Sequence, residues 1–406
     1  MTTCKWISGM FALLLACVCP PAADARSAVE SLVRDNTRFA FDLYRDLAEA
    51  EGNLFFSPYS ISTALAMTYA GARGNTEKEM AATLRFTLDQ EELHPAFATM
   101  EAQVNASQKE GISLSVANAL WPQKDYPFRE EYLSLAKQHY GVLVQPVDFR
   151  GARESARLTI NNWVEDQTRE KIKDLIQPGD LSDLTRLVLV NAIYFKGIWA
   201  DQFKAENTKE MPFHVTAART IRAPMMSRQL ECRYASLPEL DILELPYVGG
   251  GLAMIVLLPK EIDGVRKVES ELSADNLARW LGALSQREVQ VFLPKFKTTS
   301  RFSLNDTLST MGMIDAFSEA RADFSGMDGR PGWLYIGAVI HQAFVEVNEE
   351  GTEAAAATAV VMRTQAIGAP PPTFRADHPF VFLIQEKQTG SILFAGRVTD
   401  PSTAGK

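Results

Sequence analysis

The stretch EEGTEAAAATAVVMRTQAIGAPPP, residues 349–372, decides how this chain folds. Its four consecutive alanines favour a helix when they are read alone, because alanine is the best helix former. The residues before it favour a strand instead, since 338–348 is rich in β-branched and aromatic side chains and alternates from Ala343 onward. Three prolines end the stretch and exclude a helix or a central strand there.

The two-residue period of a strand divides this stretch into two faces. One face carries no charge and consists of Thr352, Ala354, Ala356, Thr358, Val360 and Met362. The other face carries charge only at its two ends, Glu353 and Arg363. Such a strand can bury one face, yet as an isolated hairpin or loop it has little to hold it. The pattern therefore predicts a loop that can become a strand.

Composition places the chain among ordinary globular proteins. Of its 406 residues 46% are apolar and 22% charged, and the net charge of −9 gives no sign of a nucleic-acid partner. The sequence lacks Gly-x-Ser-x-Gly, His-Glu-x-x-His and phosphate-loop motifs, and its five histidines show no metal-ligand spacing. We therefore expect no enzyme activity, no metal and no cofactor.

The N-terminal segment has the features of a secretory signal peptide. Lys5 precedes an apolar run at 10–18, and Ala-Asp-Ala at 23–25 predicts cleavage after Ala25. The run is too short to span a membrane. Leu-Leu-Ala-Cys ending at Cys17 resembles a bacterial lipobox, which leaves a lipid anchor open as the alternative. We therefore expect residues 1–25 to be cleaved off, leaving an extracellular or periplasmic protein. A lipoprotein anchored through Cys17 is the alternative, and the leader favours a bacterial source.

Hydrophobic periodicity and turn residues predict the elements of the remaining chain. The predicted helices are 28–47, 59–70, one opening at Asn75, 128–140, 154–176 and 301–313. The predicted strands are 112–121, 187–199, 241–246, 252–258, 289–296, 333–348, 380–385 and 391–396. Helices gather early and non-consecutive strands dominate later, which predicts an α+β fold in one domain, residues 26–406.

Several segments together resemble the serpin family of serine protease inhibitors. The segment EEGTEAAAAT at 349–358 resembles the hinge of the serpin reactive-centre loop, and NLFFSPYSISTALAMTYAG at 53–71 is similar to the serpin second-helix signature. Further matches follow in order at 191–199, Phe203, Thr208, 225–226, 245–247, 293–296, 322–326 and 378–397. The resemblance implies a large central β-sheet, two smaller sheets, about nine helices and an exposed reactive-centre loop.

The resemblance also implies an irreversible suicide inhibitor of serine proteases, with cysteine proteases as a further target class. The protease attacks the loop and forms an acyl-enzyme, and the loop then inserts into the large sheet as a new strand. The implied partner is a target protease, bound by a monomer. A non-inhibitory serpin that acts as carrier, chaperone or structural protein is the alternative, and the uncharged, proline-free face of the hinge argues against it.

The resemblance assigns roles to individual residues. The hinge comprises Glu349, Gly351, Thr352, Glu353, Ala354, Ala355, Ala356, Ala357 and Thr358, with Gly351 as its pivot. The polar cluster beneath the strands that open, here called the shutter, comprises Ser57, Ser60, Asn191 and His341, and Trp199 marks the top of the opening, the breach. His341 can equally be a hydrogen-bonded histidine of the core, which is compatible with the shutter role. For Trp199 the alternative is simple packing in the core. Counting seventeen residues from Glu349 gives Gln365–Ala366 as the reactive bond, while Arg363, Thr364 and Ile367 stay open as alternatives.

Overall fold

The computed structural model describes residues 22–352 and 370–403. Within these residues the α-helices are α1 Ala22–Leu47, α2 Pro58–Tyr69, α3 Gly74–Leu84, α4 Gln90–Ala106, α5 Glu130–Tyr140, α6 Arg153–Gln167, α7 Val265–Glu271, α8 Ala274–Gly282, α9 Asn305–Thr310 and α10 Ser325–Asp328. The strands are β1 Leu54–Phe56, β2 Ile112–Pro122, β3 Leu143–Val144, β4 Leu187–Ile198, β5 Lys209–Thr216, β6 Arg219–Ser236, β7 Leu240–Pro246, β8 Leu252–Pro259, β9 Ser285–Pro294, β10 Phe296–Ser303, β11 Val339–Val347, β12 Gly351–Thr352, β13 Thr373–Arg375, β14 Phe380–Glu386 and β15 Ile392–Val398.

The strands form two hydrogen-bonded networks. The central sheet has the order β10-β11-β12-β4-β2-β3, and the second network runs β1-β15-β14-β8-β7-β6-β9-β13 with β5 paired to β6. The predicted α+β fold with a large central sheet is confirmed. The two smaller sheets expected beside it are joined, because the 18-residue strand β6 pairs with β5, β9 and β7 in turn.

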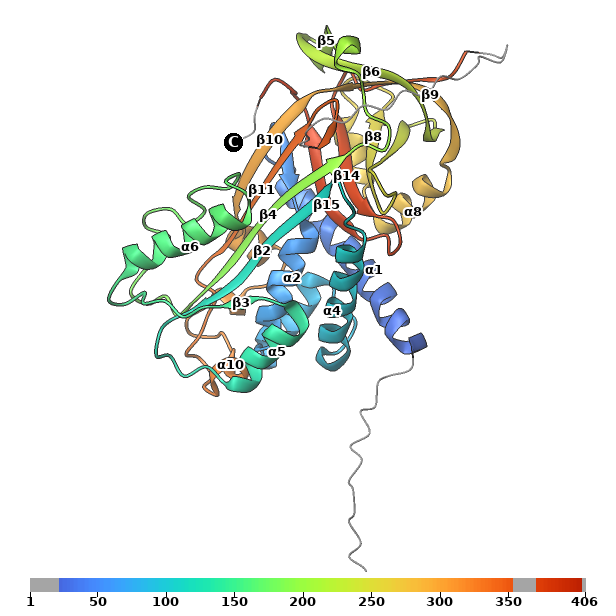
Figure 1. The fold of residues 1–406 in the computed structure, drawn as a ribbon. Helices are drawn as coiled ribbons and strands as arrows, with labels where there is room; N and C mark the ends of the chain where they lie inside the picture. The colour runs from blue at the N-terminus through green and yellow to red at the C-terminus, as the bar shows by residue number, and fades with distance from the viewer. Residues whose placement is uncertain (1–21, 353–369, 404–406) are drawn as a thin grey trace, which may run out of the picture.

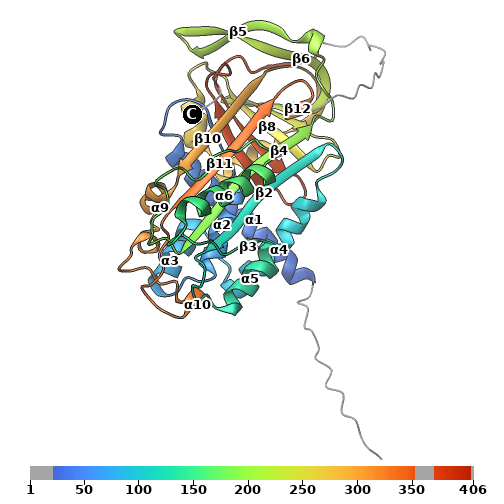
Figure 2. The ribbon, with the colours of Figure 1, turned by 60° about the vertical axis from the view of Figure 1, so that its left-hand side comes forward.

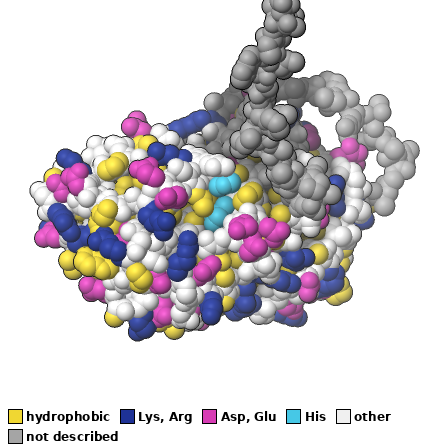
Figure 3. Space-filling view, turned by 90° about the horizontal axis from the view of Figure 1, so that it is seen from below, with side chains coloured by type: hydrophobic (Ala, Val, Ile, Leu, Met, Phe, Trp, Pro, Cys, Tyr) yellow, Lys and Arg dark blue, Asp and Glu magenta, His cyan; other side chains and the backbone are white. Residues whose placement is uncertain are grey.

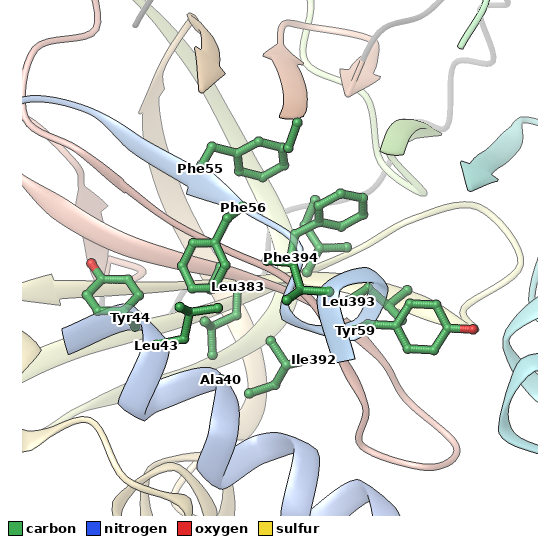
Figure 4. Close-up of a cluster of buried hydrophobic side chains, with 14 of the residues drawn as sticks. Ala40, Leu43, Tyr44, Phe55, Phe56, Tyr59, Leu383, Ile392, Leu393 and Phe394 are labelled. Atoms are coloured by element: carbon green, nitrogen blue, oxygen red, sulfur yellow. The ribbon is translucent and has the colours of Figure 1, made fainter. Parts of the chain in front are cut away.

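Helix α2 lies between the two networks and packs against β2, β4 and β15 (Figures 1 and 2). Every one of its residues is buried, which suits its many small side chains. Ser57 is its N-cap, since the Ser57 side chain accepts a hydrogen bond from the Ser60 N–H. Figure 4 shows the core beside it, where Phe55 of β1 stacks on Phe394 of β15 with ring centroids 5.1 Å apart. The start of α2 is thus fixed in the main core.

Strand β4 is buried on both faces, as its near-continuous apolar run predicts. Leu189, Ile193 and Phe195 belong to the main core. The alternate residues Val188 and Val190 belong to a second hydrophobic cluster on the other face, together with Ile160 of α6. Helix α6 therefore covers the outer face of the central sheet (Figure 2).

Two predicted helices differ in extent from the observed ones. The helix predicted over 154–176 is wrong beyond Gln167, because Arg169 and Glu170 adopt φ values of 52° and 60° that a right-handed helix does not contain. Ile172 and Leu175 are nevertheless fully buried in the second cluster. The spacing of these apolar residues thus correctly predicted burial but not a continuous helix.

The helix predicted over 301–313 is wrong in its first part. Residues 301–303 continue β10, which pairs with β11 from Phe296↔Val347 to Ser303↔Ile340, and only α9 is helical. Strand β11 begins at Val339, later than predicted, and β9 ends at Pro294. The predictions of α2, α5, β2, β4, β7, β8, β14 and β15 are confirmed to within two residues, and α1 ends as predicted but begins six residues earlier.

The predicted signal peptide falls mostly outside the described residues, as does Cys17. Helix α1 begins at Ala22, so the predicted cleavage point after Ala25 lies in its first turn. In the part of the chain that the structure describes, no helix combines the length and apolar character needed to cross a membrane.

Candidate functional site

The central sheet is open at one end, and the start of the predicted hinge lies in the opening. Strands β11 and β4 pair directly and in parallel from Val339↔Leu189 to Phe344↔Tyr194. Beyond this point β12 lies between them and runs antiparallel to both, with Thr352 opposite Val347 on one side and Gly197 on the other (Figure 2). Two residues of the hinge, Gly351 and Thr352, therefore already occupy a strand position within the sheet.

Gly351, the predicted pivot, occupies a position without room for a side chain. Its φ is +154°, and a Cβ added there would lie 2.0 Å from the Gly197 carbonyl oxygen and 2.8 Å from the Ile198 Cα. Both atoms belong to the backbone of β4, so they cannot move aside as a flexible side chain would. Glycine is thus required for β12 to reach this strand.

We expect Gly351→Ala to expel β12 from the sheet, because the added methyl overlaps the β4 backbone. Overpacking of this kind lowers the free energy of unfolding by about 1–3 kcal/mol. Amide hydrogen exchange of Trp199 should accelerate as well, since its N–H donates to the Glu350 carbonyl at 2.9 Å. Gly282→Ala is the control, because a Cβ there meets no atom within 4 Å. Equal effects of the two substitutions would contradict this account.

Thr352 is fully buried at the breach and contacts an aromatic pair. Its Oγ1 lies 2.9 Å from the Tyr247 hydroxyl. The Tyr247 ring stacks on Trp199 with centroids 4.7 Å apart, and the Trp199 Nε1–H donates to the Asn348 carbonyl at 3.0 Å. Burial raises the pKa of Tyr247 well above its ordinary value, so its hydroxyl stays protonated. Trp199 therefore lies beside the start of β12, and Tyr247 is a contact that the sequence did not reveal.

Glu349 fixes the residue at which the hinge begins. Its carboxylate accepts a hydrogen bond from Thr208 Oγ1 at 2.7 Å and pairs with Lys295 Nζ at 2.9 Å. Burial alone would raise the pKa of this carboxyl, but the bonds from Lys295 and Thr208 outweigh burial and hold the pKa below its usual range. The Glu349 carbonyl also accepts from the Phe203 N–H at 2.8 Å.

The four predicted shutter residues meet in one hydrogen-bond network at the point where β11 and β4 pair. His341 Nε2 accepts from the Ser57 N–H at 3.0 Å, so its Nδ1 carries the proton and donates to Asn191 Oδ1 at 2.5 Å. Asn191 Nδ2 in turn donates to the Ser60 carbonyl at 2.8 Å. The Ser57 hydroxyl donates to the Leu393 carbonyl at 2.6 Å. The network thus ties α2 and β15 to the two strands that would separate.

Asn118 of β2 completes the network, and the sequence analysis did not identify it as a site residue. Its Oδ1 accepts from Asn191 Nδ2 at 2.7 Å, and the two asparagines lie directly opposite each other in the β2–β4 ladder. A signal was present, because Asn118 is a polar residue between the small residues Ala117 and Ala119 of a predicted strand. The pairing of β2 with β4 was needed to connect it with Asn191.

Burial lowers the pKa of His341 to about 3. The unfolded chain then takes up this proton below about pH 6.5, whereas the native protein does so only near pH 3. The contribution of His341 to stability is therefore complete above pH 6.5 and declines as the pH falls from about 6.5 to 3. Between pH 7 and pH 5 we expect the free energy of unfolding of His341→Gln to fall by roughly 2 kcal/mol less than that of the parent, as measured by urea unfolding. Parallel pH profiles of the two proteins would contradict this expectation.

The remaining predicted site residues lie outside the described residues. These are Glu353 to Thr358 of the hinge and every candidate for the reactive bond, namely Arg363, Thr364, Gln365, Ala366 and Ile367.

Comparison with known proteins gives the family. Residues 34–401 match the family model described as Serpin (serine protease inhibitor). The chain belongs to the serpin family. It is 43% identical to the leukocyte elastase inhibitor of Xenopus tropicalis and 43% identical to that of Homo sapiens, and each alignment covers 92% of this chain and 100% of the relative. The solved structure of Serpin48 from the insect Tenebrio molitor is similar with a TM-score of 0.81 and 33% identity, over 93% of this serpin and 98% of that chain.

Proposed function

We propose that this serpin is an irreversible suicide inhibitor of serine proteases, which traps the acyl-enzyme by inserting the cleaved loop into the central sheet. The observation that carries the proposal is β12, because Thr352 already pairs with both strands between which an inserted strand would lie, and Gly351 pairs with β4. Cleavage would free the following residues to extend this pairing. The gain of strand hydrogen bonds then drives the reaction.

The register of β12 supports an uninterrupted insertion. Continuing the pairing of Thr352 by six residues brings Thr358 opposite both His341 and Asn191, which now bond directly to each other. A threonine hydroxyl can accept from His341 Nδ1 and donate to Asn191 Oδ1 at the same time. The Thr358 hydroxyl would therefore restore the link between His341 and Asn191 that insertion of the strand breaks. This gives the shutter residues and the hinge one shared role.

The same register gives the small hinge residues their places. Ala354 and Ala356 would follow Thr352 on the face toward the main core, and Ala355 and Ala357 would face α6 with Glu353. Of these five residues only Glu353 carries a bulky side chain, and on insertion it would lie at the open end of the sheet. Insertion between two closely spaced strands needs such small residues.

The chemical step belongs to the protease. Its serine oxygen attacks the carbonyl carbon of Gln365, the peptide bond to Ala366 breaks, and the serine proton ends on the Ala366 amine. The product is an ester between the protease serine and Gln365. Cleavage after Arg363, Thr364 or Ile367 would form the same ester a few residues away. The serpin thus supplies no catalytic group, which agrees with the absence of enzyme motifs from its sequence.

Leukocyte elastase is the first target to test, because the relatives at 43% identity carry its name. Trypsin is the second, since Arg363 would suit its acidic specificity pocket. Chymotrypsin and the cysteine protease papain complete a panel that separates the target classes.

We infer that the mature inhibitor is a secreted monomer, residues 26–406, which forms one domain.

The test is incubation of the mature protein with each protease, followed by a denaturing gel and mass spectrometry of the released C-terminal peptide. A complex that survives denaturation is the expected result, and the first residue of the peptide identifies the reactive bond. Cleavage without a complex would overturn the proposal and favour a non-inhibitory serpin that acts as carrier, chaperone or structural protein.

A further inference from the structure

A pocket with a volume of about 490 Å³ opens where α1, α3 and the start of α8 meet. Helix α1 packs against both of the other helices. The residues that line this pocket include none of those in the hinge, the breach or the shutter. Volumes of roughly 300–1,000 Å³ are typical of sites that bind small molecules. The pocket is therefore large enough to hold a ligand that takes no part in loop insertion.

Three arginines form the rim of this pocket, and they share a single carboxylate. Arg38 and Arg45 lie two turns apart on the same side of α1, and Arg85 is the C-cap of α3. Asp42 pairs with Arg45 at 3.2 Å and with the Arg85 Nε at 2.7 Å. Arg38 forms no hydrogen bond or ion pair with any residue that the structure describes. Three guanidinium groups and one carboxylate leave an excess of two positive charges at the rim.

The floor of the pocket is apolar. It consists of the buried side chains of Phe41, Phe86 and Leu272. Ala81 and Ala82 of α3 also line the pocket, and their short side chains leave its volume open. A ligand that uses both rim and floor must therefore carry an apolar group as well as a negative charge. Guanidinium groups match the planar or tetrahedral oxygens of carboxylates, sulfonates and phosphates.

The wall formed by the end of α3 is already ordered without a ligand. Arg85 has a φ of 63°, in the left-handed region where a helix usually ends with glycine or asparagine. The Phe86 N–H then donates to the Ala81 carbonyl at 2.9 Å. The buried carboxylate of Asp35 holds the next residue, Thr87, by accepting from its N–H at 2.9 Å and from its hydroxyl at 2.6 Å. An arginine is thus kept at a position whose backbone favours a smaller residue.

The charge distribution favours a compact anion over a polyanion. Nucleic acids and sulfated polysaccharides need a continuous basic surface. The view from below shows lysines and arginines interleaved with acidic and apolar side chains (Figure 3). The net charge of −9 also opposes a large anion. A ligand with one or two negative charges matches the excess charge at the rim.

We propose that this pocket binds an organic anion, namely a carboxylate, sulfonate or phosphate attached to a compact apolar group. The charged group would accept hydrogen bonds from the three arginines, and the apolar group would lie on the floor. Because three helices contribute to the pocket, the bound ligand would bridge them and stabilise the native protein. This binding does not depend on the inhibitory mechanism.

The test is calorimetric titration of the protein with 1-naphthalenesulfonate and with octanesulfonate, which distinguish an aromatic from an acyl ligand. Methanesulfonate carries the same charge without an apolar group, and 1-naphthalenemethanol carries the ring without the charge. We expect at least one of the first two to bind, and both partial molecules to bind at least roughly tenfold more weakly. No binding of either amphipathic sulfonate, or equal binding of the uncharged ring, would overturn the proposal.

Substitutions test whether the ligand lies in this pocket. Arg38→Gln should weaken binding at least roughly tenfold, whereas Arg34→Gln should not, because Arg34 is an exposed arginine one turn earlier on α1 and outside the pocket. Ala82→Leu should abolish binding without changing any charge, since Ala82 is exposed and the larger side chain fills the pocket. Arg85→Gly should weaken binding while α3 stays folded, because glycine suits the left-handed C-cap. Equal affinities of Arg38→Gln and Arg34→Gln, or unchanged binding by Ala82→Leu, would contradict the proposed site.

Discussion

Thr352→Arg is expected to leave the loop cleavable while abolishing the denaturant-stable complex. The Thr352 side chain is fully buried against Tyr247, and insertion must keep it there as the first strand residue after Gly351. A guanidinium at this position would be buried without a partner, which costs several kcal/mol. The native protein can avoid this cost by expelling β12, but an inserted strand cannot. The proposed cleavage site, Gln365, lies thirteen residues further along the chain, so we expect cleavage to be unaffected.

The measurement is the number of inhibitor molecules consumed for each protease molecule inactivated. We expect this number to rise at least roughly tenfold in Thr352→Arg, because almost every encounter then ends in cleavage. Thr352→Val is the matched control, since it keeps the size of the side chain and loses only the hydrogen bond to Tyr247. Inhibition by Thr352→Arg at the parent's stoichiometry would mean that Thr352 need not enter the sheet.

Cleavage of the loop should raise the melting temperature. Insertion would add roughly a dozen residues as a central strand, and each backbone hydrogen bond contributes about 0.5–1.5 kcal/mol net. The sum is on the order of 10 kcal/mol, which for a chain of this size corresponds to a rise of about 10 °C or more. Scanning calorimetry of intact and loop-cleaved protein measures the difference directly.

The same experiment on Thr352→Arg serves as the control, because its cleaved loop should stay outside the sheet and its melting temperature should change little. Equal melting temperatures of intact and cleaved parent protein would contradict insertion, whatever the protease panel shows.

Much of the fold could be predicted because it depends on local patterns. The N-cap of α2 at Ser57 and the apolar run of β4 are properties of a few consecutive residues. The helix predicted to continue to 176 failed for the same reason. Ile172 and Leu175 have helical spacing, but they are buried by contact with the outer face of the central sheet and not by a helix of their own.

The site could be predicted only through the resemblance. Only the family pattern groups Ser57, Asn191 and His341, because residues so far apart in the chain have no spacing that would predict their contact. Only the structure assigns Asn118 and Tyr247 to the site. The pairing of β2 with β4 places Asn118 opposite Asn191, and the stacking of Tyr247 on Trp199 places Tyr247 beside the hinge.

The sequence by itself determined which residues can insert, because charge, size and alternation along 352–362 are local properties of a strand. Only the tertiary structure decided where that strand begins. The opening between β11 and β4, the absence of space for a Cβ at Gly351 and the register that aligns Thr352 with Val347 and Gly197 all depend on strands that are distant in the chain. The order and register of such strands are set by packing across the whole molecule, which no local pattern records.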